Sequence, residues 1–141
     1  MKKILVVEDD NYLANAYRVK LSKARLEVKN AFDGNEALGI LQTYTPDIIL
    51  LDIVMPKKDG FATLQDLKTN EQFKNIPVII ASNLGQKEDF DKAMKLGAMG
   101  FFVKTDFSLN NLIEKINKIL NANTSPSPPA ASRPFRWAGR P

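Results

Sequence analysis

The sequence of 141 residues contains no cysteine and no histidine. Without cysteine, the chain can form no disulfide and offers neither a thiolate zinc site nor a cysteine nucleophile. Without histidine, it has no Ser-His-Asp triad, no imidazole metal site and no histidine of its own to carry a phosphoryl group. Any metal ion must therefore bind oxygen ligands, which favours a hard cation such as Mg²⁺, or Mn²⁺ in its place.

Long apolar runs are also absent. The first run, residues 4–7, stops at Glu8, well short of the ~7–15 residues of a signal-peptide core. No run approaches the ~18 residues that a membrane-spanning helix needs. Hydrophobic residues make up 44% and charged residues 26% of the chain, a balance typical of a globular domain. We therefore expect one cytoplasmic domain with no membrane span.

The positive charge is concentrated at the C-terminal end. The net charge is +4, and Arg133, Arg136 and Arg140 lie in a stretch after Ala122 that contains no acidic residue. Basic and acidic side chains nearly balance in the preceding part, so the folded region is not expected to present a basic face for nucleic acid. No direct DNA binding is predicted.

Residues 123–141 differ from the rest in composition as well. They include five of the eight prolines and the only tryptophan. A segment of this kind cannot bury enough apolar surface to fold alone. The predicted organisation is a domain over residues 1–122 followed by a proline-rich tail over 123–141. We expect the tail to be disordered or, alternatively, to bind a partner through Phe135, Arg136 and Trp137.

Five short apolar runs alternate with helical patterns along the first 122 residues. The expected strands cover residues 4–7, 27–31, 47–52, 77–81 and 101–103. The expected helices cover residues 11–23, 34–41, 60–68 and 87–96, and a last one follows Ser108. Buried strands that alternate with helices predict an α/β fold: a doubly wound parallel sheet with helices on both faces, in three layers.

Polar groups follow most of the predicted strands, and in an open parallel sheet ligands bind at this edge. The residues that follow or end the strands are Glu8, Asp9, Asp10, Asp52, Ser82 and Lys104. Clustered carboxylates repel one another unless a cation lies between them. Mg²⁺ would relieve that repulsion, while a lysine and a serine hydroxyl could hold phosphoryl oxygens. The set predicts phosphoryl transfer onto a carboxylate.

The residues at these strand ends resemble the motifs of response-regulator receiver domains, the phosphoacceptor halves of two-component signalling. The matching segments are residues 6–10, 50–60, 81–83 and 102–104, and the resemblance extends over about residues 2–121. It implies a flavodoxin-like fold with five helices and a five-stranded sheet of order 2-1-3-4-5. It also implies a chemotaxis-type regulator consisting of a single domain.

The resemblance implies that Asp52 accepts a phosphoryl group from a histidine kinase or a phosphotransfer protein. In the implied metal site, Asp9 binds Mg²⁺ directly, Glu8 binds it through water, and Asp52 and the backbone carbonyl of Val54 complete the protein ligands. Asp10 is instead interpreted as a charge at a helix N-terminus.

Three further residues match the switch of the family. Ser82 matches the switch hydroxyl, Phe101 the switch aromatic and Lys104 the lysine that pairs with the phosphoryl group. The resemblance implies that these residues change the face formed by the fourth helix, the fifth strand and the fifth helix. The implied output is a contact with a downstream protein or onward phosphoryl transfer, by a monomer or a weak phosphorylation-dependent dimer.

The sequence departs from the family pattern at two places. Thr105 follows Lys104 where the family usually has proline, so we expect a trans peptide bond there. Val54 and Leu84 are apolar at positions where fast-hydrolysing relatives often carry polar groups. We therefore expect phospho-Asp52 to be long-lived.

The sequence leaves two alternative functions. One is a receiver-like module that binds partners without phosphorylation. The other is an aspartate-nucleophile phosphatase of the haloacid-dehalogenase type, which needs a second acid two residues beyond the nucleophile, where this chain has Val54. No enzyme activity is expected beyond the protein's own phosphorylation and dephosphorylation.

Overall fold

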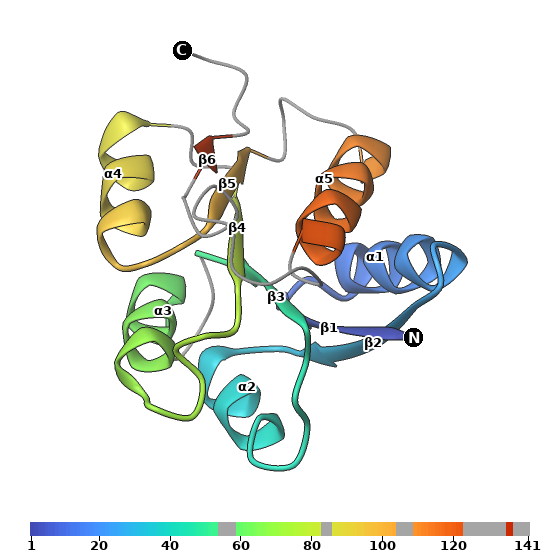
Figure 1. The fold of residues 1–141 in the computed structure, drawn as a ribbon, viewed down its shortest axis with the longest axis horizontal. Coiled ribbons are helices and arrows are strands. Elements are labelled where there is room, and N and C mark those ends of the chain that lie inside the picture. Colours follow the sequence, from blue (N-terminus) through green and yellow to red (C-terminus); the bar gives the residue numbers. More distant parts are fainter. Residues whose placement is uncertain (54–58, 83–85, 104–108, 123–134, 137–141) are drawn as a thin grey trace.

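The computed structural model describes residues 1–53, 59–82, 86–103, 109–122 and 135–136. The five expected strands all form and pair in parallel (Figure 1). They are β1 (Lys2–Val7), β2 (Leu26–Ala31), β3 (Ile48–Asp52), β4 (Val78–Ser82) and β5 (Gly100–Val103). Their order, β2-β1-β3-β4-β5, confirms the predicted topology.

The five expected helices connect these strands in the predicted sequence. They are α1 (Asn11–Lys23), α2 (Gly34–Ile40), α3 (Gly60–Thr69), α4 (Lys87–Lys95) and α5 (Leu109–Ala122). Aspartates cap the first three helices, because their carboxylates accept backbone N–H groups that have no partner within the helix. Gly97 ends α4 with a φ of +105°, a conformation that glycine adopts without strain.

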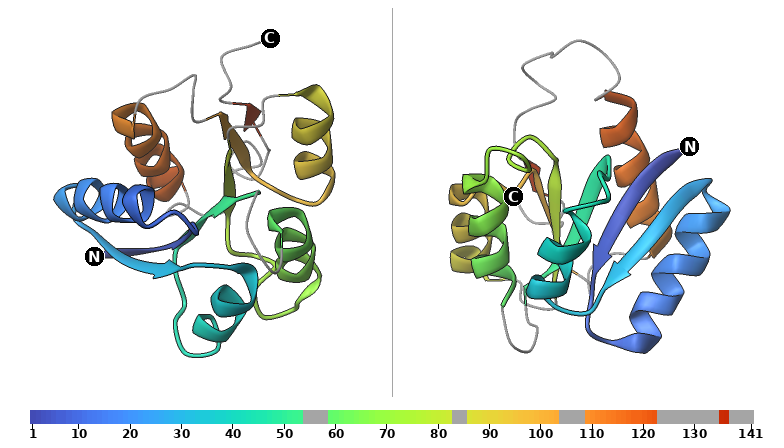
Figure 2. Two further views of the ribbon diagram at one scale, coloured as in Figure 1. Left: turned by 180° about the vertical axis from the view of Figure 1, so that it is seen from behind. Right: turned by 90° about the horizontal axis from the view of Figure 1, so that it is seen from below.

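Helices cover both faces of the sheet (Figure 2), and a separate hydrophobic core lies on each face. Alternate strand residues point to opposite faces. Leu5, Ile49 and Ile80 lie on the face covered by α2, α3 and α4. Ile4 and Leu50 lie on the other face, which α1 and α5 cover. Because the three central strands are buried on both faces, they consist of nearly continuous apolar runs.

A sixth strand, β6 (Phe135–Arg136), extends the sheet beyond β5. It runs parallel to β5, with Gly100 opposite Phe135 and Phe101 opposite Arg136. Residues 123–141 were expected either to be disordered or to bind a partner through Phe135, Arg136 and Trp137, and the sequence did not predict that Phe135–Arg136 would pair with β5. The edge of a sheet offers unpaired backbone groups that a short extended segment can use.

Within the described ranges, no helix combines the length and apolar character needed to cross a bilayer.

Lys68 ties the end of α3 to the segment that leads into β4. Its Nζ donates hydrogen bonds to the carbonyl oxygens of Ile76 at 2.8 Å and Lys74 at 3.1 Å. Gly97 packs against its aliphatic stem, where an added Cβ would lie 3.0 Å from Lys68 Cγ. This burial lowers the pKa of Lys68 from 10.5 to about 8.

The lowered pKa makes stability depend on pH. Between about pH 8 and the ordinary value of 10.5, the folded chain has released the Lys68 proton while the unfolded chain still holds it. The free energy of unfolding should therefore rise as pH increases through the lower part of this window. Urea denaturation at about pH 7.5, 8.5 and 9.5 measures the rise, and Lys68→Met should remove it.

A slope that is the same in wild type and Lys68→Met would contradict this prediction. The comparison stays below about pH 10 because burial and neighbouring negative charge raise the pKa of Tyr44 to about 12. A raised tyrosine pKa lowers stability as pH increases above the ordinary tyrosine value of 10.0.

Candidate functional site

The parallel register brings the predicted site residues to one edge of the sheet. Val7 lies opposite Leu51, so the next residues along β1 and β3 are Glu8 and Asp52. Asp52 in turn lies opposite Ala81 of β4, and Ser82 is the next residue. The carboxyl ends of three neighbouring strands thus carry an acidic group or a hydroxyl, as the sequence predicted.

Glu8, Asp9 and Asp52 form a cluster of three carboxylates. Each can contribute one oxygen to a set in which all the oxygens lie within 4.8 Å of one another. Glu8 is 2% exposed and Asp52 7% exposed, whereas Asp9 is exposed to solvent. Oxygen-only ligands on crowded, partly buried carboxylates fit a hard divalent cation, which would offset the repulsion between the three charges.

Asp10 has a different role from its two neighbours. Its Oδ1 accepts hydrogen bonds from the backbone N–H of Tyr12 at 2.8 Å and of Leu13 at 3.1 Å. It is therefore the N-cap of α1. Its own N–H donates to Glu8 Oε2 at 3.2 Å. This bond helps to orient the Glu8 carboxylate, and the Glu8 N–H donates to the Ala31 carbonyl at 2.9 Å.

Helix α3 begins in close contact with the end of β3. The Gly60 N–H donates to the Ile53 carbonyl at 2.7 Å. A Cβ at position 60 would lie only 2.3 Å from the Asp52 carbonyl oxygen and 2.5 Å from Ile53 Cα. A side chain at this position would therefore displace the backbone that holds Asp52.

Ser82 and Phe101 are both buried, at 0% and 1% exposure. Phe101 packs edge-on against Phe90 of α4, with ring centroids 6.0 Å apart and planes at 64°. Phe101 also pairs with Ile80 across β4 and β5. The predicted switch aromatic thus points into the core on the α4 side.

The acid cluster also affects α1. Burial and the negative charges of Glu8 and Asp52 raise the pKa of Tyr17, which lies in the core between α1 and the sheet. Tyr17 therefore stays neutral in the folded protein even above the ordinary tyrosine pKa of 10.0.

Several predicted residues lie outside the described part of the chain. They are Val54, Leu84, Lys104, Thr105 and Trp137, while of Phe135 and Arg136 only the backbone is described. Sequence reasoning, for its part, missed the packing of Phe90 on Phe101 and the close approach of Gly60 to Asp52. A glycine directly after Asp59, the N-cap residue of α3, was the available signal for the second feature.

This geometry defines a receiver domain. The chain matches the family "Response regulator receiver domain" over residues 4–117 and belongs to that family. It is thus a member of the two-component signal-transduction proteins.

Individual relatives agree with this assignment. The chain is 31% identical to the chemotaxis protein CheY of Halobacterium salinarum, over 86% of this chain and 98% of that protein. It is 36% identical to the probable transcriptional regulator ycf27 of Cyanophora paradoxa, over 89% of this chain and 51% of that protein. It spans about half the length of the first curated relatives that it matches.

Solved structures are similar as well. The receiver domain of the Francisella response regulator 1452 has a TM-score of 0.80 and 35% identity, over 89% of this chain and all of that one. Chemotaxis protein CheY4 of Vibrio cholerae has a TM-score of 0.78 and 29% identity, over 84% of this chain and 98% of that one. The order β2-β1-β3-β4-β5 thus belongs to a fold that solved receiver-domain structures share with this chain.

Two glycine substitutions test the contact between α3 and β3. Gly60→Ala should lower the free energy of unfolding by about 1–3 kcal/mol, because the added methyl group collides with backbone. Gly39→Ala is the matched control. Gly39 lies in α2 with nothing within 4 Å of an added Cβ, so this change should raise stability by about 0.5–1 kcal/mol. Urea denaturation measures both, and equal stability of the two variants would contradict the predicted collision.

Proposed function

We propose that Asp52 accepts a phosphoryl group and that its phosphorylation alters the α4–β5–α5 face. The observation that carries this proposal is the cluster of Glu8, Asp9 and Asp52 at the carboxyl edge of the sheet, beside the buried Ser82. Membership of the receiver family supports a kinase as the phosphoryl donor.

Each acid has its own part in the proposed reaction. Glu8 is held by the N–H of Asp10 and by its own backbone bond to Ala31. Asp9 faces solvent and Asp52 ends β3. The three carboxylates would hold Mg²⁺, which when bound neutralises negative charge between Asp52 and the incoming phosphoryl oxygens.

The proposed step forms one bond and breaks one. An oxygen of the Asp52 carboxylate attacks phosphorus, a P–O bond forms, and the P–N bond to the kinase's histidine breaks. The bonding electron pair leaves with the imidazole, which carries a proton on its other ring nitrogen and so departs neutral. The peptide group between Ile53 and Asp52 keeps Asp52 in position, because Gly60 allows α3 to pack directly against it.

We propose that the signal passes through Ser82 and Phe101. A hydroxyl that moves toward phospho-Asp52 would change the end of β4, which lies beside β5. Phe101 and Phe90 would then repack, and α4 would shift with Phe90. Lys104 is proposed to pair with the phosphoryl group, while a downstream protein reads the changed face.

We propose that the output of this chain is a contact with a protein rather than with DNA. One relative is called a DNA-binding dual master transcriptional regulator, but the chain covers 49% of its length. The matched part is thus the receiver portion alone. The near balance of basic and acidic side chains over residues 1–122 supports a protein contact rather than a contact with DNA.

Mass spectrometry with acetyl phosphate tests the proposal. With Mg²⁺ present, the protein should gain one phosphoryl group, about 80 Da, and Asp52→Asn should abolish the gain. Asp47→Asn is the matched control. Asp47 lies just before the opposite end of β3, where its carboxylate accepts the Lys3 N–H at 2.8 Å. The Asp47→Asn variant should therefore be phosphorylated like the wild type.

No gain of mass by the wild type under any condition would overturn phosphorylation. It would leave the binding module that acts without phosphorylation as the remaining function.

The lifetime of phospho-Asp52 gives a second prediction. Val54 and Leu84 are apolar, so they cannot hydrogen-bond a water molecule for attack on phosphorus. Val54→Asn and Leu84→Gln, alone or together, should therefore shorten the lifetime several-fold. The measurement is the loss of the added mass after acetyl phosphate is removed. Equal lifetimes in wild type and both variants would contradict the role of these residues.

A further inference from the structure

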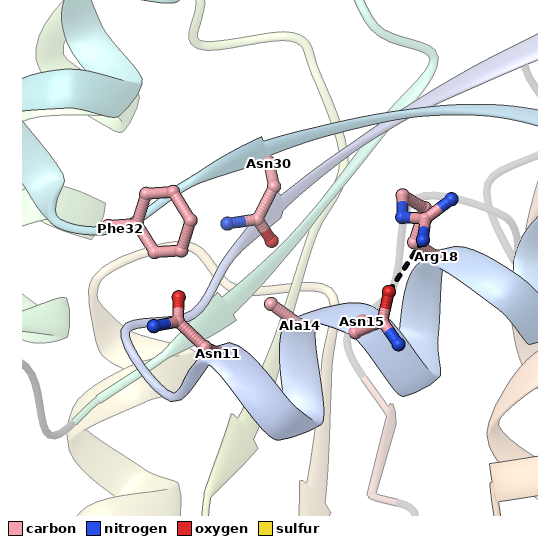
Figure 3. Close-up of a pocket in the computed structure, with 6 residues that line it drawn as sticks. All are labelled: Asn11, Ala14, Asn15, Arg18, Asn30 and Phe32. Atoms are coloured by element: carbon pink, nitrogen blue, oxygen red, sulfur yellow. Dashed lines mark hydrogen bonds between the residues drawn. The ribbon is translucent and has the colours of Figure 1, made fainter.

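A pocket of about 300 Å³ opens between α1 and the end of β2 (Figure 3). Its lining consists of Asn11, Ala14, Asn15, Arg18, Asn30 and Phe32. The four residues from α1 recur at helical spacing and so form one stripe that faces β2. The pocket is separate from the acid cluster, since none of the three carboxylates lines it.

Asn30 breaks the pattern of its strand. Leu26 and Val28 share its face of β2 and pack into the core beneath α1. At Asn30 the same face carries a carboxamide. Its Oδ1 and Nδ2 are both buried and have no hydrogen-bond partner among the described residues. Burying such a group costs stability, and positions that break a folding rule in this way are typical of functional sites.

The chemistry of the carboxamide indicates the partner that it would accept. Asn30 offers one acceptor and two donors in a plane. A group that presents a donor beside an acceptor satisfies both sides, and the edge of adenine does so. Phe32 lies beside Asn30 at the same opening (Figure 3). Phe32 is 43% exposed, and its ring can stack on a base.

Arg18 provides a site for an anion at the other end of the pocket. One of its guanidinium N–H groups donates to Asn15 Oδ1 at 2.5 Å, which holds the side chain at the rim. The remaining donors match the geometry of phosphate oxygens. Arg18 is the only charged residue of the lining, so no acidic side chain there opposes an anion.

We propose that this pocket binds an adenine mononucleotide, with its base against Asn30 and Phe32 and its phosphate at Arg18. Asn11 and Phe32 both lie beside Asn30, at the end of the pocket away from Arg18 (Figure 3), and are exposed. Exposed side chains change rotamer on a fast timescale, so they can turn aside as the base enters. The proposal does not depend on phosphorylation of Asp52.

Isothermal titration calorimetry of the full chain with AMP tests the proposal. AMP should bind saturably, adenosine more weakly because it lacks the phosphate, and inorganic phosphate not at all in the same concentration range. Asp52→Asn should bind AMP like the wild type. That result would separate this site from the phosphorylation site, so each proposal can fail without the other.

Two variants locate the site. Asn30→Leu should weaken AMP binding about 10- to 100-fold through loss of the paired base edge, and should raise the melting temperature by removing the unpaired buried amide. Phe32→Ala should also weaken binding, through loss of stacking. Tyr12→Ala is its matched control, because Tyr12 is 83% exposed and does not line the pocket.

The proposal is overturned if the wild type binds no AMP, or if Asn30→Leu and Phe32→Ala bind AMP as tightly as the wild type. Should Asn30→Leu fail to fold, Phe32→Ala decides, since Phe32 is part of neither hydrophobic core.

Discussion

Repulsion among Glu8, Asp9 and Asp52 is the constraint on which the rest of the site depends. Three carboxylates with oxygens within 4.8 Å stay together only if the backbone holds them there. The parallel register of β1 and β3 provides that restraint, because it fixes where both strands end. The cap of α1 by Asp10 and the close approach of Gly60 to the backbone of Asp52 add further restraints at the ends of these two strands.

Much of this arrangement could be predicted from the sequence because each local signal agreed with the global fold. The apolar runs of β1, β3 and β4 are too short for helices and too continuous for surface strands, so they indicated a buried parallel sheet. A parallel sheet then brings all the carboxyl ends to one edge. The positions of Glu8, Asp52 and Ser82 followed from that rule, without any knowledge of individual contacts.

The features that could not be predicted are those that depend on distances between elements. The approach of Gly60 to Asp52 depends on how closely α3 packs against β3. In the sequence alone, a glycine at this position is equally consistent with an ordinary turn. That the amide of Asn30 has no partner within the described ranges becomes evident only when β2 and α1 are placed together. The addition of β6 depends on pairing between Gly100 and Phe135, which are separated by 34 residues of the chain. A strand of two residues is too short to show the periodicity by which strands are predicted.

The two hydrophobic cores have a consequence for how this protein can change over evolutionary time. A sheet of central strands lies between them, so side chains beneath α1 and α5 do not touch those beneath α2, α3 and α4. Substitutions that are far apart and share no partner have nearly additive effects on stability. One face of the domain can therefore diversify to suit new partners, while the packing that supports α3 and α4 is preserved on the other.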